Sequence, residues 1–405
     1  MTIWTAWRWT RALWLLPVLF GLGSLHAVDS LVARSGYPVS DLVDASYVIY
    51  LLCPVLAGFA AYGMRGWVTF HRSLRARRSE LAVLVNAWWP LLWGGPVLVV
   101  VTVLVASWTW PPDAASWTVL LLDALTAMLC IVAGLAVGRV FPTAVAAPLV
   151  SVGVFVWIAY LPSTSSPVLH HLTPTLTGCC ALSVEPSDVA LRAQLTLVGG
   201  ALVGLAVMTA ARRLLGSSRS LHALVMALVL VSATGAASVV LATSDEQLTL
   251  TTVQARTAEL SCADEAGIRV CLWPESASRT GQVGAAVADL NEALVPRGFP
   301  AVDATSSDEG ADNMYVDVTP LAGPGEVTAA VARGYVNHVL DCGPRERAKV
   351  DARVAFLAVT AAGVSPEELR GEYAPEDIDE AIRQAGAAGA AARTWFFDAD
   401  CRGRS

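Results

Sequence analysis

Two polar residues stand inside otherwise apolar stretches of the sequence. Asp123 lies within residues 117–138 and Asn86 lies within residues 82–106. A carboxylate in a membrane-spanning helix costs about 2.5–3.5 kcal/mol on insertion scales, so it is expected to face the protein interior or a wet vestibule. Both residues are therefore candidates for the polar lining of a translocation path. A hydrogen bond between helices, or a side chain that reaches the membrane interface, is the alternative for each.

Residue types that bind metals occur in pairs, but not in a metal-binding pattern. His170 and His171 are followed by Cys179 and Cys180. A structural zinc site needs four converging ligands, whereas successive residues point in different directions and no second well-spaced pair follows. We therefore predict no metal site and no cofactor. His338 is the only histidine after residue 243 and is interpreted as a structural residue.

The sequence contains no constellation typical of an enzyme. It lacks the Gly-x-x-x-x-Gly-Lys-Ser/Thr pattern of a P-loop and the His-Glu-x-x-His pattern of a metalloprotease. Ser261, Ser276 and Ser306 lack the Gly-x-Ser-x-Gly context of a serine hydrolase. We predict that the chain is not an enzyme and that any ATP hydrolysis belongs to a partner chain.

Four cysteines lie in the C-terminal part of the chain: Cys262, Cys271, Cys342 and Cys401. An even number favours disulfides if this part lies in an oxidising compartment. Three pairings are possible. We prefer Cys262–Cys271 with Cys342–Cys401, because each bond then joins neighbours in a plausible α+β arrangement. Cys53 and Cys130 fall in apolar stretches and are interpreted as inert packing thiols.

The elements that would position these residues divide the chain into two parts of different composition. Residues 1–242 hold 13 Arg and 8 acidic residues, whereas residues 243–405 hold 14 basic and 26 acidic residues. Only 15% of the whole chain is charged, against about 25% in average soluble domains. The first part is predicted to be embedded in lipid and the second to be an acidic water-soluble domain. Its acidity argues against a nucleic-acid partner.

Seven stretches approach the roughly 20 apolar residues that a spanning helix needs. They are residues 12–28, 44–64, 82–106, 117–138, 143–161, 192–211 and 221–242. With a cytoplasmic N-terminus, alternate connections place 11 of the 13 Arg of this part inside, as the positive-inside rule requires. We therefore predict a polytopic α-helical protein of the plasma membrane with about seven transmembrane helices, a cytoplasmic N-terminus and a small extracellular α+β domain.

Two segments outside the spans have predicted structure. In residues 162–191, prolines mixed with apolar residues suggest two short helices that dip into the outer leaflet. For the C-terminal domain we expect strands at 268–273 and 313–318. Helices are expected at 245–260, 279–294, 325–340, 345–362 and 376–395.

Residues 65–80 form the most informative connection. Apolar side chains recur at i, i+3 and i+7, and basic side chains occupy much of the rest. The apolar residues are Trp67, Phe70 and Leu74, and the basic ones include Arg72, Arg75 and Arg78. This pattern predicts a short amphipathic helix along the cytoplasmic surface. It would either dock on a cytoplasmic partner as a coupling helix or anchor the chain to anionic membrane lipid.

This layout resembles the membrane subunit of a type-two ABC exporter. The family has six spans from a cytoplasmic N-terminus, a coupling helix where residues 65–80 lie and an outer re-entrant helical pair where residues 162–191 lie. The resemblance covers roughly residues 1–215 and rests on layout. The remainder is similar to actinobacterial permease-like proteins with a fused extracellular domain, through Cys262, residues 270–275 and Cys401.

The resemblance implies a transport subunit driven by a cytoplasmic ABC ATPase, paired with a second copy or with a related permease. The outer domain would then gate, receive or shield the exported molecule. The size and acidity of residues 243–405 favour another possibility as well. The chain would in that case be a membrane-anchored extracellular ligand-binding or sensor protein without transport activity.

Overall fold

The structure, a computed structural model, falls into two compact units. It describes residues 12–30, 35–73, 80–108, 110–111, 114–164, 172–176, 179–180, 182–214, 233–240, 252–308, 313–340, 351–357, 374–385 and 389–397. The first unit comprises Met1–Arg34 and Pro38–Ala255, and the second comprises Ser35–Tyr37 and Arg256–Ser405. Composition placed the boundary at residue 243; in the structure the chain enters the second unit after Ala255.

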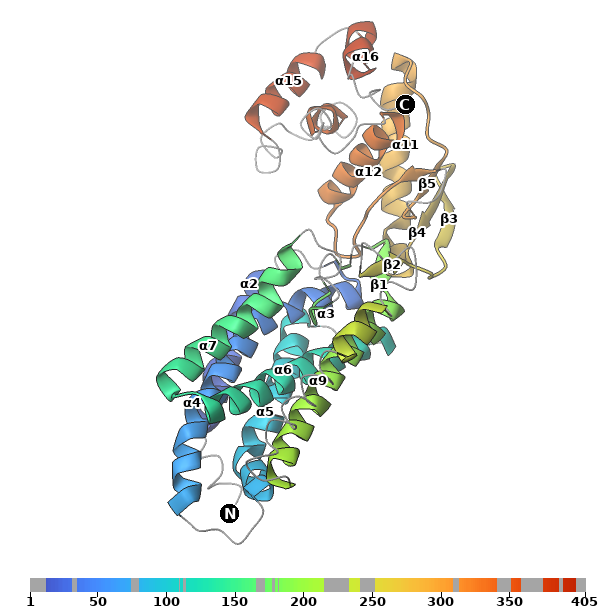
Figure 1. Ribbon diagram of the computed structural model, residues 1–405. Helices are drawn as coiled ribbons and strands as arrows, with labels where there is room; N and C mark the ends of the chain where they lie inside the picture. Colours follow the sequence, from blue (N-terminus) through green and yellow to red (C-terminus); the bar gives the residue numbers. More distant parts are fainter. Residues whose placement is uncertain are drawn as a thin grey trace. The chain divides into compact units, whose positions relative to one another are not determined.

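The first unit is a bundle of helices (Figure 1). They are α2 (Ala12–Ser30), α3 (Pro38–Ser46), α4 (Ile49–Ser73), α5 (Glu80–Ser107), α6 (Ala114–Val140), α7 (Thr143–Phe155) and α9 (Asp188–Leu214). The π-helical turn Val156–Tyr160 and the 3-10 turn Leu161–Ser163 continue α7. Helix α6 is central, since it packs against α3, α4, α5, α7 and α9.

Five helical segments of this unit are long and apolar enough to cross a membrane. They are Pro38–Met64, Trp88–Ser107, Ala114–Val140, Thr143–Ser163 and Asp188–Leu205, and Trp14–Leu25 is a shorter apolar helix. The search covers the described residues only, and of the expected span at 221–242 the structure describes residues 233–240, which are helical. The chain is therefore a mostly helical, membrane-embedded protein with a small sheet-containing C-terminal region.

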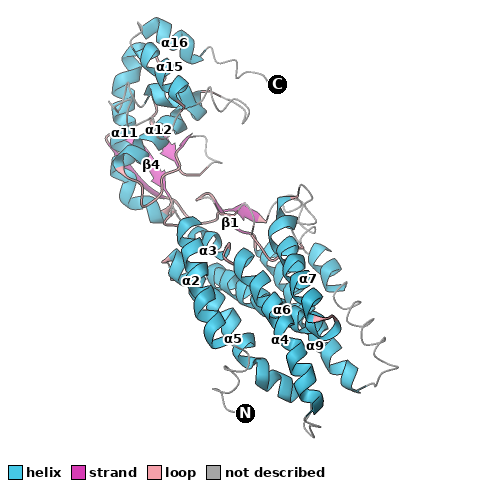
Figure 2. Ribbon diagram, turned by 90° about the vertical axis from the view of Figure 1, so that its left-hand side faces the viewer, coloured by secondary structure: helices cyan, strands magenta, loops and turns pink. Residues whose placement is uncertain are grey.

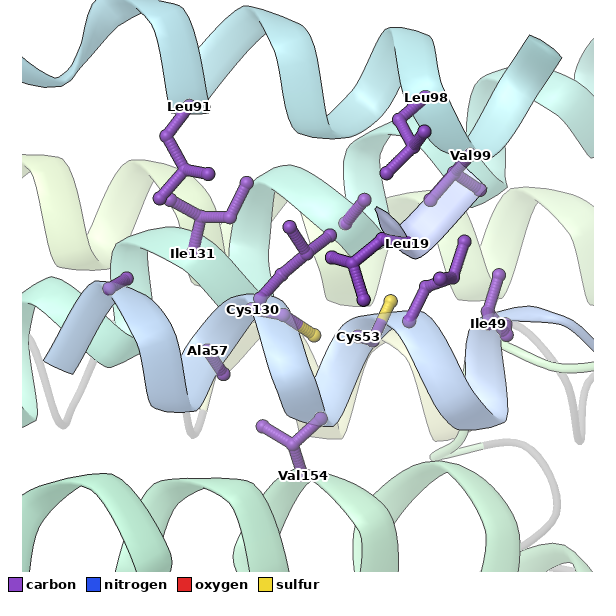
Figure 3. Packing of buried hydrophobic residues seen from close by; sticks show 14 of the residues in the cluster. Leu19, Ile49, Cys53, Ala57, Leu91, Leu98, Val99, Cys130, Ile131 and Val154 are labelled. Atoms are coloured by element: carbon purple, nitrogen blue, oxygen red, sulfur yellow. The ribbon is translucent and has the colours of Figure 1, made fainter. Parts of the chain in front are cut away.

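Small residues allow α4 and α6 to approach closely. A Cβ atom added to Gly134 would collide with the carbonyl oxygen of Ala57, and one added to Gly138 would collide with that of Ala61. Contacts between small residues four positions apart are typical of helix packing in membranes. Larger apolar side chains fill the space on either side, with Cys53 of α4 facing Cys130 of α6 (Figure 3).

The second unit is built on a four-stranded sheet, and Figure 2 shows its strands among the surrounding helices. The strands are β3 (Ser261–Glu265), β4 (Ile268–Leu272), β5 (Ala304–Ser306) and β6 (Met314–Tyr315), in the order β3-β4-β5-β6. The β3–β4 pair is antiparallel, and β4, β5 and β6 run parallel. Ala266 and Gly267 join β3 to β4 with φ angles of 52° and 80°, as a two-residue hairpin turn requires.

Helices α11 (Thr280–Leu294) and α12 (Pro324–Val339) pack against this sheet. Alternate residues of β4, namely Ile268, Val270 and Leu272, enter the core, as expected for a strand with one buried face. The helices contribute Val283, Val287, Leu290 and Leu294 from α11, and Val327, Val331 and Tyr335 from α12. Helices α15 (Pro375–Ala385) and α16 (Gly389–Phe397) complete the described part of the unit.

Several expected elements differ in the structure. The helix predicted at 245–260 is wrong from residue 253 onward. Val253–Ala255 form strand β2, which pairs antiparallel with β1 (Val184–Pro186), and residues 256–260 are not helical. Strand β1 and the non-helical residues 172–176 also replace part of the helical pair predicted in 162–191. The β-branched residues around Val253 favour a strand once a partner strand is present.

The remaining helices of the second unit follow the expected order with altered bounds. The predicted helix at 345–362 is described only at 351–357, where it is helical. The predicted helix at 376–395 corresponds to α15 and α16, which lie on either side of residues 386–388. The short strand β5 was not predicted, because three residues give no recognisable alternation.

Candidate functional site

A buried carboxyl group marks the candidate site in the first unit. Helix α6 carries Asp123, which is 3% exposed. Ser46, the last residue of α3, donates a hydrogen bond to Oδ2 of Asp123 over 2.5 Å, and its Oγ also lies 2.9 Å from the carbonyl oxygen of Leu42. Because a hydroxyl carries one hydrogen, the two acceptors share the single hydrogen of Ser46.

A small cavity adjoins this pair. Its walls come from α3, the start of α4, α6 and the stretch before β1. It is lined by Val43, Ser46, Tyr47, Ile49, Val119, Leu122, Asp123, Pro174, Thr175 and Leu176. Its volume of about 20 Å³ is close to the space that one water molecule occupies. None of these ten lining residues is basic, so the cavity presents hydrogen-bond acceptors and one acidic group.

Further buried polar groups occur on α6 and α9. Gln194 of α9, which is 0% exposed, donates from Nε2 to the carbonyl oxygen of Thr175 over 3.1 Å. The Oε1 atom of Gln194 and the Oγ1 atom of Thr126 are buried without a hydrogen-bond partner. Such atoms are rare in folded proteins, where water or a ligand usually satisfies them. The arrangement can therefore accept hydrogen bonds from water or from a cationic or protonated group.

The positions of the acidic residues of α3 can be explained without a role in the candidate site. Asp41 lies in the first turn of this helix, where the partial positive charge of the helix end favours a carboxylate. Asp44 follows one turn later and is half-buried. The candidate site is accordingly defined by Asp123, Ser46 and the cavity beside them.

The predicted coupling segment is only partly described. Helix α4 continues without interruption to Ser73, so Trp67, Phe70 and Arg72 lie on the same helix as the span. The expected separate amphipathic helix is therefore wrong for residues 65–73, because α4 does not end at the membrane boundary that hydropathy indicated. Leu74, Arg75 and Arg78 lie outside the described residues. Asn86 is within α5, and the surroundings of its side chain also lie outside the described part.

The cysteines of the second unit include one bonded pair. Cys262 of β3 and Cys271 of β4 are directly opposite in the strand register, with Cα atoms 4.0 Å apart, and form a disulfide. Cys342 and Cys401 lie outside the described residues.

The remaining cysteines belong to the first unit. Cys53 and Cys130 are free and buried, and Cys179 is bonded to its neighbour Cys180. His170 and His171 lie outside the described residues. In the described part of the chain, no three His, Cys, Asp or Glu side chains form a group that could hold a metal ion.

The second unit contains a buried arginine that sequence reasoning missed. The guanidinium of Arg256 lies 4.2 Å from the ring centre of Tyr37 and 4.7 Å from that of Trp273. Its Nη2 atom is 2.5 Å from Oε1 of Glu275, and the Arg256 side chain is only 6% exposed. Tyr37 is more than 200 residues away from the others in sequence, so no local pattern could have linked them.

A larger groove lies between α11 and α12. Its volume is about 220 Å³, and polar groups enter it from Gln282, Asp289 and Thr328. The rest of its lining is apolar or small and includes Ala285, Ala286, Val331, Ala332 and Leu357. A concave surface with a few polar groups is the usual form of a small-molecule site.

Comparison with known proteins relates only the second unit to a family. Residues 270–400 match a family described as a domain of unknown function (DUF7224). No curated protein and no solved structure matches the chain. The family match thus groups most of the second unit into one domain and leaves the activity to be argued from the residues.

Proposed function

We propose that this chain is a transmembrane subunit of an ATP-binding-cassette exporter and is driven by a separate cytoplasmic ATPase. The observation that carries the proposal is Asp123, a carboxyl group held by Ser46 beside a small cavity inside a bundle of apolar helices. A bundle that only anchors a domain needs no buried acid, and such a group is expensive in a membrane. Residues of this kind commonly mark the pathway of a transported molecule or ion.

The course of α4 supports a mechanical link between the cytoplasmic side and this cavity. The helix runs from Ile49, which lines the cavity, to Ser73, two residues before Arg75 and the arginines that follow it. A helix of 25 residues is about 37 Å long, so a force on its cytoplasmic end would be transmitted along one continuous helix to Pro54, the proline five residues from Ile49. In this proposal the ATPase pushes on the end of α4, and the second unit lies outside the cell.

Helix α7 offers a surface for a second permease subunit or for lipid. Of the five candidate spans, the segment Thr143–Ser163 has the smallest buried share. Its exposed side chains include Val145, Leu149, Val152 and Phe155. A paired subunit of the same or a related kind would cover this face in the assembled transporter.

Copurification with a coexpressed cytoplasmic ABC ATPase tests the proposal. Exchanging Arg72, Arg75 and Arg78 together for Glu is expected to abolish ATPase association, because the docking segment would reverse its charge. The matched control is Arg192→Glu, an exposed arginine near the start of α9 that pairs with Asp188. Retention of the ATPase by the triple variant, at the level of the control, would rule out the coupling role of residues 65–80.

The groove between α11 and α12 favours one alternative, a membrane-anchored extracellular ligand-binding or sensor protein. In this case the groove takes a small ligand and the helices serve as the anchor. Ala285→Trp would fill the groove from an exposed position. If the chain is a sensor, this variant should lose ligand binding, and the chain should support no partner-dependent ATP turnover. The transporter role predicts that ATP turnover with the partner persists.

A further inference from the structure

The hydroxyl group of Ser46 lies between two other oxygen atoms. Its Oγ atom is 2.9 Å from the carbonyl oxygen of Leu42 and 2.5 Å from Oδ2 of Asp123. Heavy-atom distances alone do not say which atom of a hydrogen-bonded pair carries the hydrogen. Ser46 supplies one hydrogen, whereas an ionised carboxylate supplies none. If Asp123 is ionised, one of the two contacts therefore lacks a hydrogen.

A protonated Asp123 provides a hydrogen for each contact. The carboxyl O–H donates to Oγ of Ser46, and the Ser46 hydroxyl then donates to the carbonyl oxygen of Leu42. Asp123 and Ser46 are 3% and 9% exposed, and buried polar groups in native proteins are nearly always hydrogen-bonded. The number of available hydrogens therefore favours the neutral acid.

Among the described side chains, no positive charge lies near Asp123. The first unit has two described basic side chains, Arg139 and Arg192. Arg139 is sixteen residues further along α6, which is about 24 Å. Arg192 is exposed and lies 3.6 Å from Asp188. A buried charge without a partner usually neutralises, so the surroundings favour a protonated carboxyl group as well.

The other titratable groups on the elements around Asp123 supply no positive charge either. They are Asp41 and Asp44 of α3, Tyr47 before α4, Tyr50 and Cys53 of α4, and Cys130 of α6. The described side chains of α5 and α7 include no titratable group, and those of α9 include only Asp188 and Arg192. With one arginine distant and the other paired, the site is acidic or neutral throughout.

The cavity beside Asp123 can receive the proton. Its volume of about 20 Å³ leaves room for one water molecule. One wall, residues 174–176, is held by Gln194 of α9, whose Nε2 donates to the carbonyl oxygen of Thr175 over 3.1 Å. A water molecule in this space can accept a proton from Asp123 and return it.

We propose that Asp123 and Ser46 form a proton-binding site, in which Asp123 carries a proton at neutral pH and exchanges it with water in the adjacent cavity. On release, the proton moves to a water oxygen and the O–H bonding pair stays on the carboxylate. Ser46 then turns its hydrogen from Leu42 to Oδ2 of Asp123. Because this hydrogen bond joins α3 to α6, exchange of the proton changes the contact between two helices. The use of this change in transport rests on the proposed function, whereas the bound proton does not.

Infrared spectroscopy of the full chain in detergent at neutral pH tests the bound proton. The spectrum should contain the C=O stretch of a protonated carboxyl group, and Asp123→Asn should lose this band. Asp188→Asn, which removes an exposed carboxylate, should leave the band in place and lose carboxylate bands instead. Loss of carboxylate bands in Asp123→Asn would show that Asp123 is ionised and would overturn the proposal.

A second variant keeps the acid and changes only its partner. Ser46→Ala should retain the C=O band and shift its frequency, because the carboxyl group loses its hydrogen bond to Oγ. An unshifted band in this variant would overturn the pairing of Asp123 with Ser46. This comparison does not depend on whether Asp123→Asn folds.

Transfer into D₂O tests the exchange. The C=O band of the wild-type chain should move to lower frequency as the carboxyl group takes up deuterium. Val119→Leu, which fills the cavity, should slow this shift several-fold, whereas Val145→Leu at an exposed position of α7 should not. A wild-type band that never shifts would overturn the exchange, and an unchanged rate in Val119→Leu would overturn the role of the cavity. None of these measurements needs an ATPase, so failure of the proton site and failure of the exporter proposal remain distinguishable.

Discussion

Asp123 combines a high cost of burial with few contacts that would offset it. Its carboxyl group shares a hydrogen bond with Ser46, and the cavity beside it has room for about one water molecule. Replacing a buried ionisable group by an apolar residue of similar volume is often neutral or stabilising. Stability alone therefore does not explain an acidic residue at this position. A functional role does.

We predict that Asp123→Asn retains the fold and loses function. Asparagine has nearly the same shape and can still accept the hydrogen bond from Ser46, so thermal stability should change little. Partner-dependent ATP turnover should fall at least about tenfold, as expected for a residue needed in the translocation step. Thr102→Ala is the matched control, because this buried hydroxyl bonds only to its own helix at Leu98. Unchanged turnover in Asp123→Asn would make the carboxyl group a structural one.

Arg353 supplies hydrogen-bond donors to the carbonyl groups at the end of α16. Its Nε donates to the carbonyl oxygen of Phe396 over 2.8 Å and its Nη2 donates to that of Trp395 over 2.9 Å. The guanidinium also lies 4.8 Å from the Trp395 ring, and the residue is 6% exposed. Carbonyl groups in the last turn of a helix have no partner within that helix, and Arg353 supplies one.

Arg353→Met should therefore release α16 from the second unit. The two carbonyl groups would lose their donors, at a cost of about 1–3 kcal/mol. Hydrogen–deuterium exchange of peptides from residues 389–397 should accelerate accordingly. Arg393→Met, on the exposed side of the same helix, should change the exchange much less. If both variants exchange alike, packing of the aromatic residues, rather than Arg353, holds the helix.

At the level of elements, the contact between α4 and α6 is the most constrained in the bundle. We predict that Gly134→Leu separates these helices, because the new side chain would enter the α4 backbone at Ala57. Overpacking of this kind typically costs about 1–3 kcal/mol. Gly153→Leu on α7 is the matched control, since a Cβ there meets no atom within 4 Å. The midpoint of thermal unfolding in detergent, followed by size-exclusion chromatography, should fall only for Gly134→Leu.

Hydropathy and local periodicity predicted the elements whose apolar residues follow a regular pattern in the sequence. The long apolar helices and α11 follow from hydrophobic patterns that repeat over several turns, and β4 from a short apolar run. The helix expected at 245–260 was wrong because β2 gains its stability from pairing with β1, some 70 residues earlier in the chain. The sequence identified Asp123 as unusual, but not Ser46 as its partner. Contacts between residues so distant in sequence leave no local signal.

Long-range contact also explains why the Arg256 site was missed. Arginine, tyrosine and tryptophan are ordinary near a membrane surface, and only the fold brings Tyr37 to Arg256 and Trp273. The same holds for the groove between α11 and α12, whose lining residues are unremarkable in sequence. Sites built from the interior of one element were therefore predictable, whereas sites shared between distant elements were not.

For the whole molecule, composition and cysteine chemistry support the same arrangement. The first unit carries the apolar helices, and the second carries most of the acidic residues and the Cys262–Cys271 disulfide. Disulfides persist in oxidising compartments outside the cytosol. The arginines of the connections favour a cytoplasmic N-terminus, and the seven crossings predicted from the sequence would then carry the second unit to the outer face.

We predict on this basis that a cysteine at Ser278, an exposed position of the second unit, reacts with a membrane-impermeant maleimide in intact cells. A cysteine at Val140, an exposed position where α6 ends, should react only after permeabilisation, because the connection of α6 to α7 carries Arg139 and is expected inside. Labelling of both positions in intact cells would contradict the expected side of the α6–α7 connection. Protection of Ser278→Cys until permeabilisation would place the second unit in the cytosol. In that case the conditions that favour its disulfide would be absent and the end of α4 would face away from the ATPase, so the exporter proposal would fail with the topology.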